Sequence, residues 1–392
     1  MTIVLTGGGS GGHITPILAV AHELKRLRPD VQIVYIGQKG DRLGDLPKQS
    51  PDIDLVYSVR AGKFRRYHNE GPRQLLDIKT MVKNIRDVGF VVVGFFQSWL
   101  LLRRIHPDSL FIKGGFVGVP VGLAAAMHKI PFITHDSDAM PGLANRIIGR
   151  WAAVHAVALP QEVYKYPPQK TVTVGVPIHA NYQPVTPEIQ VKFRREIGLG
   201  EYNQVVLITG GGLGARRLNT AAAAIVPGLL KDYTRLAIVH TVGRGNEAVM
   251  HQTYEQELSP ADLKRVTIEG YLTDLYKYSA ASDVIIARAG ATNLAEFAVQ
   301  GKACVIVPNP LLTGGHQLKN AAYLAEHQAI EIVTEQDTLR HNGKLDTVVR
   351  NILDSQSLRG TLSQNLSTFA QPNAAARLAE LLLKQMPQKA SS

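Results

Sequence analysis

The chain has 392 residues, of which 45% are hydrophobic and 19% charged, a composition typical of a globular protein of about two domains. Its single cysteine, Cys304, excludes an intramolecular disulfide and fits a reducing compartment. The formal net charge of +11 favours an anionic partner, such as a phosphorylated substrate or an anionic lipid surface. The chain opens directly on an apolar run, so we expect no cleaved signal peptide.

Short apolar runs alternate along the chain with stretches of helical periodicity. In residues 14–28, apolar side chains recur every three or four positions and charged side chains fall between them. The apolar runs lack polar alternation, which is typical of strands covered on both faces of a parallel sheet. This order predicts a doubly wound α/β fold. The predicted strands are 2–6, 31–36, 109–112, 131–135, 204–209, 235–241, 283–287 and 303–307.

A glycine-rich loop follows the first strand of each half, at Gly7–Gly12 and at Gly210–Ala215, and each loop opens a helical stretch. The repeat predicts two Rossmann-like domains with parallel sheets that face each other across a cleft. The proline-rich segment 160–188 is the predicted hinge. We expect an N-terminal domain at 1–180, a C-terminal domain at 181–370, and a C-terminal helix in 371–392 that packs back on the first domain.

Both glycine loops leave backbone N–H groups at the start of a helix, where a phosphate binds well. Their glycine spacing matches the dinucleotide fingerprint, but neither half has an acidic residue at the end of its next strand to hold a ribose. No Gly-Lys-Ser/Thr follows, so neither is a Walker loop. We interpret both as phosphate sites; the alternative is that the glycines only permit tight turns.

Basic residues are concentrated between Arg60 and Arg104, where ten Lys or Arg stand against three Asp or Glu. Within this segment Val88–Leu102 is an uncharged run of fifteen residues, shorter than the roughly 20 needed to span a bilayer. We expect residues 60–104 to dock on an anionic membrane surface; the alternative is a core helix with a solvated basic rim. The segment does not resemble a nucleic-acid-binding module, so we expect no nucleic-acid partner.

Several motifs resemble, in order, those of the MurG enzymes, the UDP-N-acetylglucosamine: N-acetylmuramyl-(pentapeptide) pyrophosphoryl-undecaprenol N-acetylglucosamine transferases of glycosyltransferase family 28. The resemblance covers nearly the whole chain. It rests on Gly8–His13 with Pro16, Gly114–Val117, His135-Asp136 with Gly142–Asn145, Ala289–Ala291 with Glu296, and His316-Gln317 with Asn320.

This resemblance implies the two-domain GT-B fold and an inverting transfer of N-acetylglucosamine from UDP-GlcNAc to a lipid-linked N-acetylmuramyl-peptide, in peptidoglycan synthesis. It implies no cofactor, and we read neither Asp136-Ser137-Asp138 nor Asp52-Ile53-Asp54 as a metal site. The expected partners are UDP-GlcNAc, a lipid-pyrophosphate acceptor and a membrane surface. The expected location is peripheral, on the cytoplasmic face of the cell membrane.

Glycosyl transfer needs a base for the attacking hydroxyl, and His13 at the end of the first loop is the candidate. Asp136 either orients the histidine or takes the proton itself. The resemblance assigns the phosphate of the sugar acceptor to Gly9, Ser10, Gly11, Gly12, Asp138 and Asn145. It assigns the UDP-sugar to Gly211, Gly212, Arg288, Gly290, Ala291, Glu296, His316, Gln317 and Asn320, with Glu296 on the ribose hydroxyls.

The chain departs from the family pattern at a few positions, which concern the sugar acceptor and the phosphates. They are Asp136, Ser137, Asp138, His179, Gly212, Leu213 and His316. Three other readings stay open at this point: a transferase of the same fold acting on another lipid such as diacylglycerol, a UDP-GlcNAc epimerase, and a nucleotide-dependent oxidoreductase.

Overall fold

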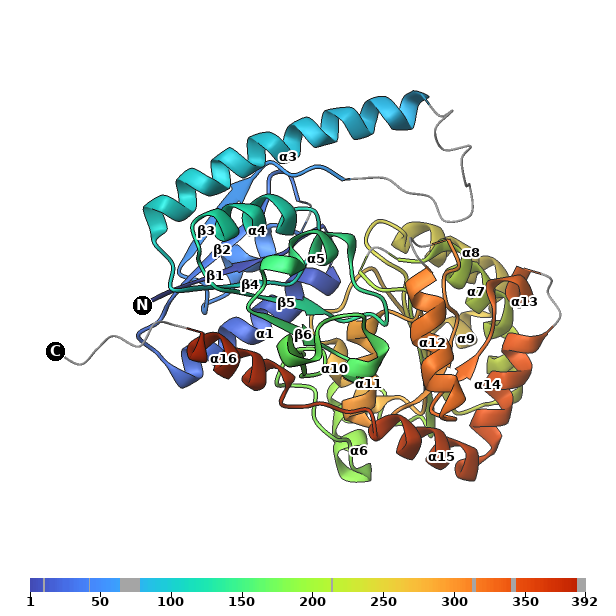
Figure 1. Ribbon diagram of the computed structural model, residues 1–392. Helices are drawn as coiled ribbons and strands as arrows, with labels where there is room; N and C mark the ends of the chain where they lie inside the picture. The colour runs from blue at the N-terminus through green and yellow to red at the C-terminus, as the bar shows by residue number, and fades with distance from the viewer. Residues whose placement is uncertain are drawn as a thin grey trace. The chain divides into compact units, whose positions relative to one another are not determined.

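The computed structural model describes residues 1–9, 11–41, 43–63, 78–212, 214–311, 315–339 and 343–385. The chain forms two compact units (Figure 1). Unit 1 contains residues 1–180, 311–316 and 371–392, and unit 2 contains residues 181–310 and 317–370. Unit 2 is therefore inserted into unit 1 along the chain.

Unit 1 is built on a seven-stranded sheet with the order β3-β2-β1-β4-β5-β6-β7, in which every described pair is parallel. The strands are β1 (Thr2–Thr6), β2 (Gln32–Gln38), β3 (Leu55–Val59), β4 (Ser109–Ile112), β5 (Phe132–Asp136), β6 (Val154–Val157) and β7 (Thr171–Thr173). The helices are α1 (Gly11–Leu27), α2 (Asp45–Gln49), α3 (Ile78–Ile105), α4 (Gly118–Met127), α5 (Leu143–Ile148) and α16 (Ala374–Lys384).

Helices cover both faces of this sheet because successive strand residues point to opposite sides. Ile3 and Leu5 of β1 pack in a cluster with α1 and α16, whereas Val4 between them packs in a cluster with α3 and α4. Leu378 and Leu382 of α16 are fully buried, and each such side chain contributes about 2 kcal/mol. The last described helix is thus part of the core of unit 1.

Unit 2 repeats the plan with a six-stranded parallel sheet of order β10-β9-β8-β11-β12-β13. The strands are β8 (Gln204–Thr209), β9 (Leu236–Thr241), β10 (Val266–Glu269), β11 (Val284–Ala287), β12 (Ala303–Ile306) and β13 (Glu331–Ile332). The helices are α6 (Pro187–Glu196), α7 (Arg216–Asp232), α8 (Glu247–Glu257), α9 (Pro260–Leu263), α10 (Leu275–Ala281), α11 (Ala291–Gln300), α12 (His316–Glu326), α13 (Glu335–Leu339), α14 (Lys344–Asp354) and α15 (Gln356–Ser367).

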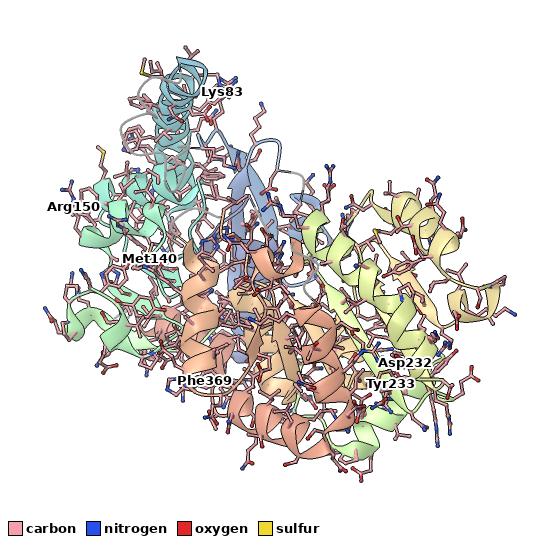
Figure 2. The ribbon with its side chains drawn as sticks, turned by 90° about the vertical axis from the view of Figure 1, so that its right-hand side faces the viewer. Lys83, Met140, Arg150, Asp232, Tyr233 and Phe369 are labelled. Carbon is pink, nitrogen blue, oxygen red and sulfur yellow. The ribbon has the colours of Figure 1, made fainter. Side chains whose placement is uncertain are left out.

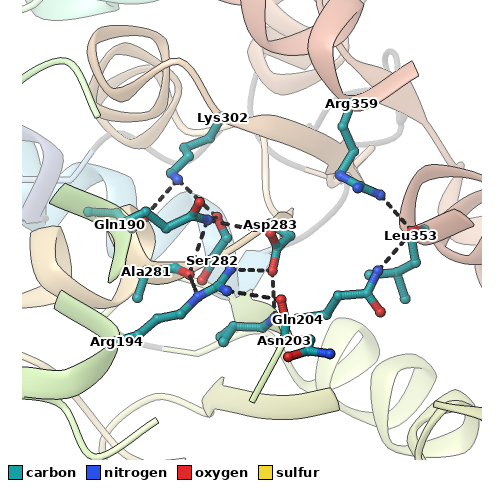
Figure 3. Close-up of polar contacts among 12 residues, drawn as sticks. Gln190, Arg194, Asn203, Gln204, Ala281, Ser282, Asp283, Lys302, Leu353 and Arg359 are labelled. Carbon is teal, nitrogen blue, oxygen red and sulfur yellow. Dashed lines mark hydrogen bonds and ion pairs between the residues drawn. The ribbon is translucent and has the colours of Figure 1, made fainter. Parts of the chain in front are cut away.

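A buried polar cluster fixes α6, the first helix of unit 2, to the end of α10 (Figure 3). Arg194 of α6 binds the Asp283 carboxylate at 2.6 Å and the carbonyl of Ala281 at 2.9 Å. The buried Lys302 ammonium donates to the carbonyls of Ala280 and Ser282, at 2.7 and 2.9 Å. Both cations thereby use the carbonyls that the last turn of a helix leaves unpaired.

The doubly wound α/β prediction is confirmed, and each predicted strand appears within two residues of its expected bounds. The length argument for the apolar run at Val88–Leu102 is wrong, because this run is only part of the 28-residue helix α3. Within α3, residues 81–105 are long and apolar enough to cross a bilayer. Only 22% of their most apolar 18-residue stretch is buried in the protein. The predicted positions Ser10 and Leu213, and residues 64–77 of the basic segment, lie outside the described residues.

The segment after β3 crosses α3 at two glycines. A Cβ on Gly94 would overlap the carbonyl of Arg60, and a Cβ on Gly62 would overlap that of Asp87. The Arg60 N–H also donates to Gln97 Oε1 at 2.8 Å. The two backbones therefore meet with no side chain between them, which only glycine permits, and the crossing holds α3 against the end of β3.

We expect Gly94→Ala to lower the free energy of unfolding by about 1–3 kcal/mol, because the added methyl group has no room at the crossing. Gly89→Ala on the same helix is the matched control, since a Cβ there meets nothing within 4 Å. It should be neutral or raise the free energy of unfolding by about 0.5–1 kcal/mol. Urea denaturation of the full chain measures the free energy of unfolding of both variants. Equal changes for Gly94→Ala and Gly89→Ala would contradict a close backbone contact at Gly94.

Candidate functional site

The candidate residues follow the strands beside the point where the order of each sheet reverses. In unit 1 the reversal lies between β1 and β4, and in unit 2 it lies between β8 and β11. Ligands of doubly wound folds bind in the crevice that forms there, at the carboxyl ends of the strands. The first glycine loop follows β1 and the second follows β8, so each unit has one candidate site.

The first glycine loop is held by an acidic residue that the sequence analysis missed. Gly9 has a φ of +84°, a conformation that favours glycine. Its N–H donates to Asp41 Oδ2 at 2.7 Å, and the N–H of Leu43 donates to the other Asp41 oxygen at 3.0 Å. Asp41 lies three residues beyond the end of β2, just past the position where an acid was sought. Gly11 and Gly12 begin α1.

His13 is partly buried in the first turn of α1. Its Nδ1 lies 3.1 Å from the carbonyl oxygen of Gly8. Because a carbonyl can only accept, Nδ1 carries the proton, and the lone pair of the neutral ring is then on Nε2. Burial, assisted by the charge of Lys113, lowers the pKa of His13 to about 4. The imidazole is therefore neutral at pH 7.

Asp136, at the end of β5, is buried and accepts three hydrogen bonds. The donors are the Gly142 N–H at 2.9 Å, Asn145 Nδ2 at 3.0 Å and the Tyr166 hydroxyl at 2.8 Å. Burial raises the pKa of Asp136, although these hydrogen bonds oppose the shift. Within the described residues Asp136 makes no hydrogen bond with His13. This arrangement favours a positioning role for Asp136, which holds the loop between β5 and α5.

Asp138 lies in that loop, and Asn145 lies in the first turn of α5. The negative charge of Asp138 acts on both His13 and Lys113, raising the pKa of each against the effect of burial. The side-chain amide of the buried Asn145 also donates to the carbonyl of His135 at 2.9 Å. The charge of Asp138 therefore acts on the candidate base, while the predicted catalytic role of Asp136 stays a prediction.

The second glycine loop lies against residues from two neighbouring strand ends. Gly211 has a φ of +82°, and a Cβ on Gly212 would lie 3.3 Å from the ring of Tyr271. The guanidinium of Arg244 stacks over the same ring, 4.5 Å from its centroid. Arg244 and Tyr271 were not predicted, because a single cation or aromatic residue in a loop carries no local signal of its own.

Glu296 lies on α11 and is only 8% exposed. Burial raises the pKa of Glu296 to about 8, although the neighbouring Tyr182 hydroxyl lowers it. Tyr182 is far from Glu296 in sequence, so spacing could not identify it as a partner.

Arg288 follows β11 and forms a buried ion pair. Its guanidinium donates to Glu335 Oε1 at 2.5 Å and to the carbonyl of Val307 at 2.9 Å. Glu335 also binds Arg217 at 2.6 Å. These contacts give Arg288 a structural role, because it joins α13 to the end of β11, and its contact with the UDP-sugar stays a prediction.

The remaining predicted donor residues lie around the starts of α11 and α12. Gly290 is the N-cap of α11, where no side chain caps the helix, and Ala291 is its first residue. On α12, which begins at His316, Gln317 Oε1 accepts the N–H of Asn309 at 2.9 Å and Asn320 Nδ2 donates to the carbonyl of Ala289 at 3.3 Å. Gln317 and Asn320 therefore order the loops that follow β11 and β12.

Among the described residues, no group of three or more His, Cys, Asp or Glu side chains has a geometry that could hold a metal ion. Asp52 and Asp54 serve other contacts, since Asp52 binds His22 at 3.2 Å and Asp54 binds Lys25 at 2.9 Å.

Comparisons with known proteins match both units. Residues 3–157 match the glycosyltransferase family 28 N-terminal domain, and residues 205–378 match the C-terminal domain of that family.

Full-length relatives carry the name UDP-N-acetylglucosamine--N-acetylmuramyl-(pentapeptide) pyrophosphoryl-undecaprenol N-acetylglucosamine transferase. The protein of that name from Moorella thermoacetica is 31% identical over 98% of this chain and 99% of its own length. That from Bacillus pumilus is 30% identical over 97% of this chain and 98% of its own.

Solved structures share the fold. Acinetobacter baumannii MurG has a TM-score of 0.69 at 24% identity, covering 98% of this chain and 99% of that one. The UDP-GlcNAc 2-epimerase of Neisseria meningitidis has a TM-score of 0.64 at 14% identity, covering 98% of this chain and 100% of that one.

The raised pKa of Glu296 predicts a pH-dependent stability. Between its ordinary value of 4.5 and about 8, the folded chain keeps a proton that the unfolded chain releases. The contribution of this carboxyl to stability is therefore complete below pH 4.5 and is lost as the pH rises through about 8. We compare the free energies of unfolding of Glu296→Gln and of the wild type. From pH 5 to pH 8 the variant should become more stable relative to the wild type, by up to about 1.4 kcal/mol per pH unit.

Urea denaturation at four pH values checks this, with Glu255→Gln on the exposed face of α8 as the control. The control should keep a constant difference from the wild type. Parallel pH profiles for Glu296→Gln and the wild type would show that Glu296 is ionised in the folded chain.

Proposed function

The chain belongs to glycosyltransferase family 28 and, within it, to the MurG transferases, and from this premise we propose that it transfers N-acetylglucosamine from UDP-GlcNAc to a lipid-linked N-acetylmuramyl-peptide. The matches to both family domains and to full-length transferases support the reaction class. The observation that carries the chemistry is the hydrogen bond from His13 to Gly8, because it leaves the other ring nitrogen able to take a proton.

In the proposed reaction, His13 Nε2 removes the proton of the attacking sugar hydroxyl. The hydroxyl oxygen forms a bond to the anomeric carbon of N-acetylglucosamine as the bond from that carbon to the UDP oxygen breaks. Attack from the face opposite UDP inverts the anomeric centre. The low pKa of His13, about 4, means that the free base is available at every physiological pH, and the negative charge of Asp138 favours the imidazolium that forms.

In unit 2, Glu296 is the proposed contact of the ribose hydroxyls. The backbone N–H groups at Gly211 and Gly212, with the uncapped start of α11 at Gly290, are proposed to bind the departing diphosphate. Arg244 beside the second glycine loop adds a positive charge there. These groups would stabilise the leaving UDP without a metal ion.

The acceptor is a lipid, and α3 supports docking on a membrane surface. Its outer face exposes an apolar stripe, with Ile85, Phe96 and Leu100 between 58% and 67% exposed. Arg103 and Arg104 lie in its last turn, and Lys83 lies near its N-terminal end (Figure 2). An apolar stripe bordered by cations suits the interface of an anionic bilayer, where each cation contributes on the order of 1 kcal/mol.

The opposite face of α3 packs on unit 1, which favours docking over a span. Leu102 is 1% exposed in a cluster with α4, and Phe95 and Trp99 pack against the same cluster. The buried Asp87 pairs with Arg86 at 3.0 Å, and these charges would have to enter the hydrocarbon if α3 crossed the bilayer. We propose that the protein lies peripherally on the cytoplasmic face of the cell membrane.

Transfer of labelled N-acetylglucosamine from UDP-GlcNAc to a lipid-linked muramyl-peptide, with a chelator present, tests the reaction and its independence from metal. The wild type should transfer the label. His13→Ala should lower kcat by about 10²- to 10⁴-fold with the KM for UDP-GlcNAc little changed. Glu296→Ala should raise that KM by about 10- to 100-fold, since it removes the proposed hydrogen bonds between this carboxyl group and the two ribose hydroxyls.

Arg217→Ala is a suitable control, because this partly exposed residue pairs with Glu335 and has no proposed contact with either substrate. Binding of UDP-GlcNAc without transfer would keep the donor and point to another lipid acceptor. Full activity of His13→Ala would exclude His13 as the base.

Membrane docking predicts that Ile85→Glu/Phe96→Glu binds anionic phosphatidylglycerol vesicles at least about 10-fold more weakly than the wild type, because two apolar side chains, each worth about 2 kcal/mol when buried, are replaced by anions. Val249→Glu on α8 is the matched control, at 65% exposed, and should bind like the wild type. Vesicle sedimentation measures both, and equal losses would mean that docking does not use α3.

A further inference from the structure

Lys113 is the first residue after β4 and lies at the reversal point of the unit 1 sheet. Its N–H donates to the carbonyl of Thr6 at 2.9 Å, which continues the pairing of β4 with β1. A Cβ on Gly7, the first residue of the glycine loop, would lie 3.2 Å from Lys113 Cβ. The lysine is therefore beneath the loop that leads into α1, in the crevice where a ligand of this fold binds.

The side chain of Lys113 is unusual for a lysine, since it is only 4% exposed. Among the described residues its ammonium has no hydrogen-bond or ion-pair partner within the usual distances. Lys302, at 5% exposed in unit 2, instead donates two hydrogen bonds to carbonyls. An ammonium in such an environment loses hydration free energy unless something replaces the water. A polar or anionic ligand would therefore stabilise the Lys113 ammonium, which the described residues leave without a direct partner.

The side chains around Lys113 indicate which ligand would suit its ammonium. Asp138 and Asp136 act on the ammonium from a distance and favour its charged form, although burial lowers the pKa of Lys113 to about 8. The carboxylate of Asp136 is already satisfied by three donors, and that of Asp41 by two N–H groups. Among the described residues, the Lys113 ammonium and the start of α1 are two positive groups of the crevice, and together they suit a phosphoryl oxygen.

We propose that Lys113 binds the pyrophosphate of the lipid-linked acceptor, as a specificity-determining residue beneath the first glycine loop. This inference rests on the proposed function. The sugar hydroxyl that attacks and the pyrophosphate that carries the lipid belong to one molecule, so an ammonium beside His13 orients the hydroxyl toward the base. The bound anion also offsets the positive charge that Lys113 directs at His13.

Calorimetric titration of the full chain with inorganic pyrophosphate, in the presence of saturating UDP, tests the site apart from the reaction and blocks the donor diphosphate site. Lys113→Met should weaken pyrophosphate binding by about 10-fold or more, as expected for loss of a charge-assisted hydrogen bond. Lys113→Arg, which keeps the charge, should lose less. Lys48→Met, which removes an exposed cation of α2 (62% exposed), should bind like the wild type.

Kinetics of the same variants give a second readout. Lys113→Met should raise the KM for the lipid acceptor by about 10-fold or more, with the KM for UDP-GlcNAc changed less than about 3-fold. Methionine fills the same volume without a charge, so this variant should fold, and its urea midpoint checks that it does.

Unchanged pyrophosphate affinity in Lys113→Met, or no pyrophosphate binding by the wild type, would overturn the inference and leave a structural lysine solvated by buried water. If the wild type transfers sugar and Lys113→Met keeps the wild-type acceptor KM, the inference falls and the proposed function stands. If the wild type transfers no sugar but binds pyrophosphate through Lys113, the anion site stands and the proposed function falls.

Discussion

The parallel arrangement of the strands is the constraint on which the rest of this structure depends. Parallel strands end at the same edge of a sheet, so every loop that follows a strand emerges on one side. Where the strand order reverses, neighbouring loops diverge and leave a crevice. His13, Lys113 and Asp136 come from distant parts of the sequence, and they are neighbours because β1, β4 and β5 end together. Unit 2 brings the second glycine loop and Gly290 together in the same way.

Burial of charge gives these edges their chemistry. Lys113, Glu296 and Arg288 are each less than a tenth exposed, and each has a different solution. Arg288 has a carboxylate partner and becomes part of the framework. Burial favours the protonated form of Glu296, which lies beside the Tyr182 hydroxyl. Lys113 stays a cation with distant acids around it. The ion pair of Arg288 adds rigidity. The protonation states of Glu296 and Lys113, in contrast, respond to what binds beside them.

The sequence predicted the parts of the structure that local patterns determine. Uniformly apolar runs and the two glycine loops predicted the strands, the fold class and the start of α1. The order of the motifs along the chain indicated the family. What sequence reasoning missed depends on long-range packing, such as the Tyr182 contact with Glu296 or the Asp41 contact with Gly9. The length of α3 was underestimated because the charged residues that border Val88–Leu102 were read as its ends, although a helix continues through charges that reach solvent.

The insertion of unit 2 into unit 1 has a consequence for the order of folding during synthesis. Strand β4 and helix α16 touch through the hydroxyl of Ser109 and the carbonyl of Leu382, which are 273 residues apart, and Leu378 fills the core beside β1. Residues 1–180 are synthesised before α16, so the core of unit 1 lacks this helix until unit 2 has been made. Unit 2 is continuous enough to fold earlier. During that interval the apolar face of the unit 1 sheet awaits its last helix, so the period of greatest exposure to chaperones and to aggregation falls on the half of the protein that begins synthesis first.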